Sequence, residues 1–417
     1  MAKENYIVSL DIGSSGVNTV ISQIIPEEKP RVIGVGRSSS AGLRRGVIVD
    51  LEEVSQSIKS SVEQAERMAG INVEDVYVSI GGSHLFCNPT KGVIAVGKAD
   101  GEVTEEDVER VMDASQAINV PHNYEILHVI PQSFNLDNQG GIKEPIGMSG
   151  VRLEMRGIIV MAFAPHLQNI SKCLNNIGFE INGFVASPLA SAKAVLNKRQ
   201  KELGVVLVDI GGGTTSMAVY EERELIYLSV LPVGAGHITN DVAIGMRTSV
   251  DVAEKVKIKY GSAIPSEISK GDQINLSEID SEEEGNVSRK HISEIIEART
   301  EEIFQMVEKE LKKINRSALL PAGAVLTGGG SCLHGMVDLA KDNLKLPAQV
   351  GFPAELSGLI DKVDDPTFSV SVGIILWALE EDRQSGSKNT SGVFTNFKDF
   401  DKMKDVKKWF KGFLPGD

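Results

Sequence analysis

The sequence predicts an α/β protein with two substantial domains. The chain has 417 residues, enough to bury more than one hydrophobic core. Two similar units lie about half a chain apart, at residues 6–24 and 205–220, and each has an apolar strand, an Asp-Ile-Gly turn and a return strand. A third apolar strand, at 324–327, also runs into a glycine turn. This repetition predicts two related halves that face one ligand.

The second unit, VVLVDIGGGTTSMAVY, predicts a buried strand that ends at Asp209 and a return strand after the turn. Its three glycines carry no Cβ atom, so backbone N–H groups can approach a phosphate closely. The threonine hydroxyls add donors, and a carboxylate at a strand end can hold a divalent cation through water. An ordinary glycine-rich hairpin is the alternative for this unit taken alone. The predicted phosphate-binding residues are Gly211, Gly212, Gly213, Thr214 and Thr215.

The N-terminal unit, YIVSLDIGSSGVNTVISQI, is a shorter version of the same pattern. Asp11 ends the strand, and two serines take the hydroxyl positions. Two such units predict two hairpins that close on one polyphosphate, with Asp11 and Asp209 as candidate metal ligands through water. The predicted phosphate-binding residues of this unit are Gly13, Ser14 and Ser15.

Further glycines mark the third turn and a loop that enters a helix near residue 237. A flat glycine surface after a strand lets a planar base or a ribose pack against the backbone. The N-terminus of a helix suits a phosphate or a ribose. The residues predicted to approach the ligand here are Gly328, Gly329, Gly330, Gly234 and Gly236. Together, the three turns predict a nucleotide site.

The elements between the turns support the α/β interpretation. After the first hairpin, a strand at 32–38, a helix between Asp50 as N-cap and Gly70, and a strand at 76–80 give the order βββαβ. Residues 84–161 depart from this order and predict a small α/β core of their own. The predicted elements of this insert are strands at 93–96, 125–134 and 157–164 and a helix at 104–118, capped by Thr104 with Asp107 at N3.

The second half carries candidate charged groups on two predicted helices. Glu254 and Lys257 share one face of a helix at 252–260, where a solvated charge pair is one interpretation and a ligand-binding pair the other. Arg299 lies on a long helix at 287–313. Its guanidinium plane could stack on a base, or it could form a surface ion pair.

Composition excludes several classes of protein. The net charge of -14 offers no basic field for nucleic acid. The three cysteines are scattered without a CxxC motif, which argues against disulfides and structural zinc. We expect a cytoplasmic protein, because no signal peptide precedes residue 6 and no apolar run approaches the ~18 residues that span a bilayer.

The C-terminal segment predicts a membrane-surface helix. Residues 382–396 are rich in Ser, Gly, Asn, Lys and Thr and predict a flexible linker. In the helix expected at 397–417, apolar residues form one stripe and lysines cover the other faces, which favours an anionic membrane surface over a docked core helix. The apolar stripe comprises Met403, Val406, Trp409, Phe410, Phe413 and Leu414, and the lysines are Lys404, Lys407, Lys408 and Lys411.

The order DIGSS, VDIGGGTT and LTGGG resembles the superfamily of actin, DnaK-type chaperones and sugar kinases. Within it, the chain is most similar to the bacterial cell-division family FtsA, over residues 6–379 and into the tail. Supporting stretches lie at 46–50, 78–82, 231–239 and 287–299. The resemblance implies an actin-like two-domain ATPase fold with an inserted α/β subdomain and a C-terminal amphipathic helix.

The resemblance also implies domain boundaries, nucleotide-binding residues and catalytic residues. It implies that Glu254 and Lys257 serve the ribose and adenine and that Arg299 lies near the adenine. In the chaperones and MreB, a glutamate orients the attacking water where this chain has Ser187, so with Asp209 and Ser187 as catalytic candidates we expect slow ATP turnover at best. The implied segments are 1–83, 162–203 and 368–381 for the first domain, 84–161 for the insert, 204–238 and 323–367 for the second domain, 239–322 for its smaller lobe, 382–396 for the linker and 397–417 for the tail.

The implied function is an ATP- and Mg²⁺-dependent polymer on the cytoplasmic side of the cell membrane at the division site. Its expected partners are the C-terminal peptide of FtsZ, copies of itself, an anionic membrane surface, and later division proteins through the insert. A pilus-assembly scaffold of the PilM type and a metabolic kinase of the same superfamily are the alternatives. The detached tail favours the division protein over PilM, and no catalytic aspartate of a kinase stands out in the first domain.

Overall fold

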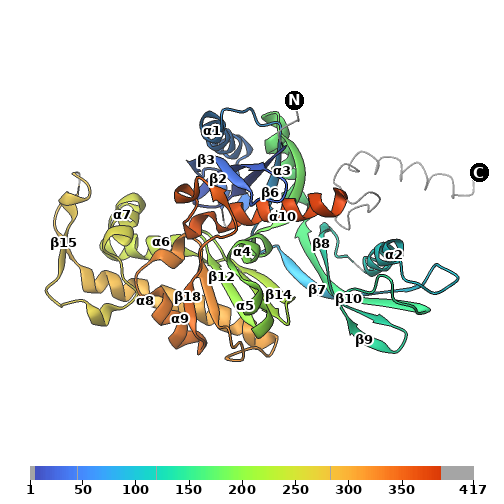
Figure 1. Ribbon diagram of the computed structural model, residues 1–417. Coiled ribbons are helices and arrows are strands. Elements are labelled where there is room, and N and C mark those ends of the chain that lie inside the picture. The colour runs from blue at the N-terminus through green and yellow to red at the C-terminus, as the bar shows by residue number, and fades with distance from the viewer. Residues whose placement is uncertain (1–4, 45, 119, 282, 387–417) are drawn as a thin grey trace, which may run out of the picture.

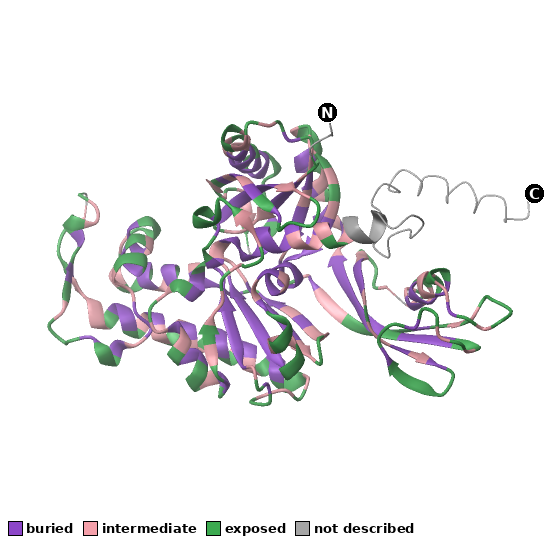
Figure 2. Cartoon of the chain, in the orientation of Figure 1, coloured by how far each residue is buried: buried purple, intermediate pink, exposed green. Residues whose placement is uncertain are grey.

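A computed structural model describes residues 5–386 apart from Arg45, Asn119 and Glu282. Two β-sheets dominate the fold, with the insert at one end and the β15 hairpin projecting at the other (Figure 1). Buried residues follow the strands of both sheets and the helix faces turned toward them (Figure 2). The predicted tail at 397–417 and residues 387–396 of the predicted linker lie outside the described residues.

The first sheet has six strands in the order β11-β6-β1-β2-β3-β19. It contains the predicted βββαβ unit, whose helix α1 (Leu51–Ala69) is capped by the Asp50 carboxylate and ends at Gly70 with φ of 72°. The strands are β1 (Asn5–Ile12), β2 (Gly16–Ile24), β3 (Arg31–Ser39), β6 (Asp75–Ile80), β11 (Glu180–Ala186) and β19 (Ser357–Gly358). A small hairpin, β4 (Leu43–Arg44) and β5 (Val47–Ile48), precedes α1.

The second sheet has nine strands, because the insert extends it. The order is β18-β17-β12-β13-β14-β7-β10-β8-β9. The first five strands are β18 (Ala348–Val350), β17 (Ala324–Thr327), β12 (Val205–Ile210), β13 (Thr215–Glu221) and β14 (Glu224–Leu231). The insert supplies β7 (Phe86–Ala95), β10 (Arg152–Phe163), β8 (Tyr124–Leu136) and β9 (Gln139–Ile142).

The insert has its own apolar core, as the sequence predicts. Val103, Val111 and Met155 belong to a cluster of buried residues separate from the two larger cores. Helix α2 (Glu105–Ser115) covers this sheet and begins with the predicted capping box of Thr104 and Asp107. The predicted strand at 93–96 is too short, since β7 begins at Phe86.

The insert also docks onto the edge strand β14. Ser229 pairs with Phe86. Beside that pair, the Leu228 N–H donates to Cys87 Sγ at 3.3 Å and the thiol donates to the Leu228 carbonyl at 3.4 Å. Gln132 Nε2 donates to the Leu225 carbonyl at 2.6 Å. The insert is therefore joined covalently to the first sheet and by hydrogen bonds to the second.

Helices cover both sheets and lie between them. They are α3 (Ala164–Asn176), α4 (Ser187–Val195), α5 (Lys198–Leu203), α6 (Ala235–Met246), α7 (Val250–Tyr260), α8 (Arg289–Lys313), α9 (Met336–Leu344) and α10 (Ser369–Gly386). Shorter elements are β15 (Gln273–Asn275), β16 (Asn286–Ser288), and 3-10 turns at Pro265–Glu267, Leu276–Glu278, Gly329–Cys332, Ile360–Lys362 and Pro366–Phe368. Among the described helices, none is both long enough and apolar enough to cross a bilayer.

Helices α4 and α10 pack closely against each other at the centre of the molecule (Figure 1). A Cβ atom at Gly373 would lie 1.9 Å from the Ala190 carbonyl oxygen, so this crossing requires glycine. Helix α10 continues to Gly386, which corrects the predicted linker boundary: residues 382–386 are helical. The prediction of a linker rested on the Ser, Gly, Asn, Lys and Thr content of the whole segment. Its first part is compatible with a helix, since residues 380–383 are Glu, Glu, Asp and Arg.

Candidate functional site

The two predicted Asp-Ile-Gly turns have the same shape and touch each other. In the first, the Gly13 N–H donates to the Gly16 carbonyl at 3.0 Å, and in the second the Gly211 N–H donates to the Thr214 carbonyl at 2.9 Å. A Cβ atom at Gly212 would lie 2.9 Å from the Cβ of Ser15. The two hairpins, from different sheets, therefore meet tip to tip.

The third glycine turn packs against the second hairpin. Gly328 has φ of 77°, and a Cβ atom there would lie 2.3 Å from Asp209 Oδ1. A Cβ atom at Gly330 would lie 2.4 Å from the Ile210 side chain. Thr367 links this turn to the first hairpin, because its carbonyl accepts from Asn18 Nδ2 at 3.3 Å and its methyl group lies 3.3 Å from a Cβ built on Gly329.

The N-terminus of α6 supports the second hairpin. The Ala235 and Gly236 N–H groups donate to the Gly211 and Gly212 carbonyls, both at 2.8 Å. A Cβ atom at Gly234 would lie 2.4 Å from the Gly211 carbonyl oxygen. Gly234 and Gly236 thus hold the turn in place, a contact that the sequence interpretation did not include.

Two carboxylates, half-buried Asp11 and buried Asp209, lie next to the turns. Burial raises the pKa of Asp11 to about 7, with the Ser79 hydrogen bond opposing this and the charge of Asp209 adding to it. Burial likewise raises the pKa of Asp209 to about 6, and a hydrogen bond from Ser191 opposes it. Both aspartates lie near the end of the strand that enters a glycine turn, and Asp209 Oδ1 also faces the third turn at Gly328.

Each carboxylate has a serine partner. Ser79 Oγ donates to Asp11 Oδ1 at 2.8 Å and accepts from the Ile12 N–H at 3.2 Å. Ser191 Oγ donates to Asp209 Oδ2 at 2.6 Å. The sequence interpretation missed both serines and Asn18, which pairs with Asp11 across β1 and β2. The position of Ser191 four residues after Ser187 was the available signal, since such residues share a helix face.

Three of the predicted hydroxyl residues have contacts within the protein. Ser14 Oγ accepts from the Gly46 N–H at 3.0 Å. Thr215 is fully buried and donates to the Val233 carbonyl at 2.8 Å, so its hydroxyl faces the protein interior, contrary to the predicted phosphate contact. Ser187 is the first residue of α4 and is buried beside Gly81, where a Cβ atom would lie 3.2 Å from Ser187 Oγ.

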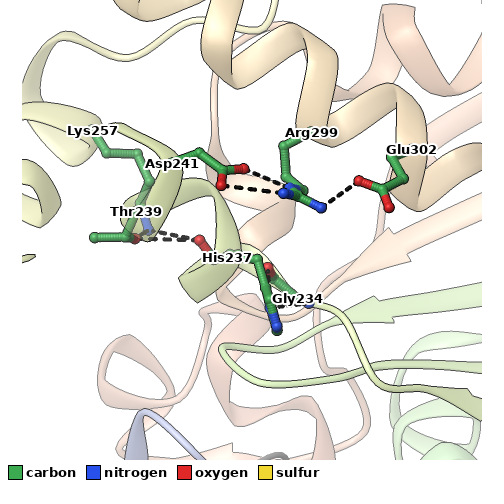
Figure 3. A network of polar contacts seen from close by, with 8 residues as sticks. Gly234, His237, Thr239, Asp241, Lys257, Arg299 and Glu302 are labelled. Atoms are coloured by element: carbon green, nitrogen blue, oxygen red, sulfur yellow. Dashed lines mark hydrogen bonds and ion pairs between the residues drawn. The ribbon is translucent and has the colours of Figure 1, made fainter. Parts of the chain in front are cut away.

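Lys257 belongs to a network at the N-terminal half of α6 (Figure 3). Glu254 is its ion-pair partner. Lys257 is only 8% exposed, whereas its ion-pair partner Glu254 is 43% exposed, so the pair is solvated on the glutamate side only. Its Nζ donates to Glu254 Oε2 at 2.6 Å, to Thr239 Oγ1 at 2.8 Å and to the Ala235 carbonyl at 3.4 Å. Because Ala235 bonds to the Gly211 carbonyl, this network is continuous with the second turn.

Arg299 is held by two carboxylates, as the ion-pair alternative predicts. Its Nε donates to Asp241 Oδ2 at 2.5 Å and an Nη donates to Asp241 Oδ1 at 3.1 Å. Another Nη donates to Glu302. Figure 3 shows the guanidinium between these two side chains, joining α8 to α6 beside the Lys257 network.

Two sheets with glycine turns that converge between them define an actin-like fold, and comparison with solved structures agrees. The PilM–PilN type IV pilus biogenesis complex matches with a TM-score of 0.65 and 17% identity, covering 90% of this chain and 99% of the other. MreB5 of Spiroplasma citri bound to AMPPNP matches with a TM-score of 0.54 and 14% identity, covering 92% and 99%.

Sequence relatives identify the family. Cell division protein FtsA of Pseudomonas aeruginosa is 38% identical over 386 residues, 93% of this chain and 92% of that protein. FtsA of Bacillus subtilis is 37% identical over 388 residues, covering 93% and 87%. The family description "Cell division protein FtsA" matches residues 206–373, and "SHS2 domain inserted in FTSA" matches residues 82–161. The chain belongs to the FtsA family of cell division proteins.

Proposed function

We propose that this chain binds ATP between its two sheets, polymerises on the inner face of the cytoplasmic membrane and tethers FtsZ filaments there. The observation that carries the proposal is the meeting of three glycine turns beside the carboxylates of Asp11 and Asp209. Support comes from the family, and from MreB5 of Spiroplasma citri, which was solved with ADP and with AMPPNP.

Each glycine turn would bind a different part of the nucleotide. The Gly13–Ser15 and Gly211–Thr214 turns would hold the phosphates through backbone N–H groups, and the Gly328–Gly330 turn would take the ribose and base. Glu254 and Lys257, oriented by Thr239, would serve the ribose, and the guanidinium plane of Arg299 would face the base.

Asp11 and Asp209 fit a Mg²⁺ site. Asp209 is buried and Asp11 is half-buried, desolvation raises both pKa values, and carboxylate oxygens are ligands that Mg²⁺ prefers. The cation would neutralise these carboxylates and the phosphate oxygens. Ser187 can hydrogen-bond a water but cannot act as a general base at neutral pH, so ATP would act mainly as a conformational ligand with slow turnover.

Membrane attachment would come from the C-terminal segment. Six apolar side chains at up to ~1.5–3 kcal/mol each and lysines at ~1 kcal/mol each near an anionic leaflet give a large gross attraction. Ordering the helix and immobilising the chain oppose most of it. One tail would therefore bind reversibly, and a row of polymerised subunits would bind firmly through multivalency.

Two regions would receive protein partners. The smaller lobe at 239–322 would bind the C-terminal peptide of FtsZ, and the insert would bind later division proteins or neighbouring subunits. A PilM-like scaffold is the second candidate, favoured by the structural match to the PilM–PilN complex. The lysine-rich tail favours the membrane tether.

A sedimentation experiment with anionic liposomes tests the proposal. We expect the full chain to co-sediment more strongly with Mg-ATP, to bring FtsZ into the pellet, and to bind one ATP per chain by calorimetry. A chain ending at Gly386, which keeps α10 whole, and the Trp409→Glu variant should stay in the supernatant while still binding ATP. Unchanged sedimentation of both variants would contradict the tether, and absence of ATP binding would contradict the nucleotide site.

A further inference from the structure

Helix α4 contacts both sheets and places the hydroxyl of Ser191 beside the carboxylate of Asp209. The helix continues directly from β11 of the six-stranded sheet and also contacts β6. On its other side it contacts β12 and β13 of the nine-stranded sheet. Ser191, one turn into the helix, is fully buried and lies 2.6 Å from Asp209 Oδ2 at the end of β12.

The Ser191 hydroxyl has one proton and two acceptors within reach. The Ser187 carbonyl, its helical i−4 neighbour, lies at 3.0 Å, and the Asp209 carboxylate at 2.6 Å. A hydrogen bond to an ionised carboxylate is shorter and about twice as strong as one to a neutral carbonyl, so the proton belongs to Asp209. The other carboxylate oxygen, Oδ1, faces the third turn at Gly328.

We propose that Ser191 is a positioning residue for Asp209: it fixes the rotation of the carboxylate so that one oxygen is presented to the bound metal and nucleotide. Because the hydroxyl comes from a helix that contacts both sheets and the carboxylate from a strand of one of them, we infer that the same bond ties metal-dependent binding to the position of α4 between the sheets. This inference rests on the proposed nucleotide function. Ser79 has the matching role for Asp11, within the first sheet.

The test compares ATP affinity with and without Mg²⁺ for Ser191→Ala. We expect roughly ten-fold weaker binding with Mg²⁺, the loss expected for a hydrogen bond to a charged group, and a much smaller change in EDTA. Ser191→Thr, which keeps the hydroxyl, should restore most of the affinity. A merely structural serine would weaken both conditions equally.

Ser61→Ala is the matched control, because Ser61 is also a fully buried helical serine whose hydroxyl is bonded, to the Gly36 carbonyl at 3.1 Å. It should leave the ratio of affinities with and without Mg²⁺ unchanged. If Ser191→Ala binds ATP with the affinity and Mg²⁺ dependence of the wild type, the inference about Ser191 is overturned and the proposed function is not affected. An unsubstituted protein that binds no ATP would overturn the proposed function, and the inference with it.

Discussion

At the scale of single residues, the burial of Asp209 makes the stability of the nucleotide-free fold depend on pH. Asp209 is buried and its pKa is raised from the ordinary value to about 6. The folded state therefore binds its proton more tightly than the unfolded chain does. This contribution to stability is complete at low pH and is lost as the pH rises through about 6.

Asp209→Asn should thus stabilise the nucleotide-free protein at pH 8, by roughly 2–3 kcal/mol at about 1.4 kcal/mol per pKa unit. The amide oxygen can still accept from Ser191. The gain should shrink as the pH falls toward 4, while Mg-ATP binding is lost at pH 8. Denaturant unfolding of both proteins at pH 8 and at pH 4 measures this change in the free energy of unfolding.

The control for that comparison is Asp338→Asn, which removes one negative charge from a side chain that is 61% exposed. It should change the free energy of unfolding little at either pH. An Asp209→Asn gain of the same size at pH 4 and pH 8 would contradict the assigned pKa.

Sequence reasoning located the glycine turns and both aspartates, because strand ends and glycines are local signals. It missed Ser191, for which the spacing from Ser187 was the one signal, and it could not locate Ser79, whose contact with Asp11 joins residues 68 positions apart. It also placed the Thr215 hydroxyl at the ligand, although the side chain alternation of β13 turns it toward Val233.

At the scale of elements, the predicted order of helices and strands is present, and the differences have local causes. Strand β7 was predicted too short because it contains Pro89, which usually marks a strand end. Pro89 pairs with Ile158 of β10, and β14 pairs with β7 only at Phe86, so the side of β7 facing β14 tolerates a residue without an N–H.

The crossing of α4 and α10 gives a prediction at this scale. Gly373→Ala should lower stability by roughly 1–3 kcal/mol, because a Cβ atom 1.9 Å from the Ala190 carbonyl forces the helices apart. The better helix propensity of alanine offsets only part of this. Thermal unfolding measures the loss.

Gly271→Ala is the matched substitution, since a Cβ atom there would meet nothing within 4 Å. Its melting temperature should stay within a degree or so of wild type or rise slightly. A Gly373→Ala protein as stable as Gly271→Ala would show that the two helices can separate without cost.

At the scale of the whole molecule, the insert joins both sheets. The sequence predicts its separate core, but not its contact with β14, because that contact depends on residues 93 and 141 positions apart in the chain. Cys87 completes the edge of β14 by exchanging two hydrogen bonds with Leu228, and burial raises the pKa of its thiol to about 11, so it stays protonated and can donate.

Cys87→Ala should therefore loosen the insert. Leu228 is buried, and its N–H would lose its partner, at a cost of about 1–3 kcal/mol. Amide exchange of β14 should accelerate relative to that of β12, while Cys87→Ser, which keeps a donor and acceptor, should exchange more slowly than Cys87→Ala. Equal exchange in all three proteins would contradict the docking role.

Helix α10 has a mechanical consequence. Its first residue, Ser369, shares a hydrogen bond of 2.6 Å with Thr327, at the entrance to the third glycine turn, and the helix then runs without interruption to Gly386. Eighteen helical residues make a rigid rod about 27 Å long. No loop interrupts the path from the C-terminal end of this helix to the third glycine turn, which we propose binds the base. We therefore expect that a force pulling on that end would reach the turn and change the affinity of the subunit for its nucleotide.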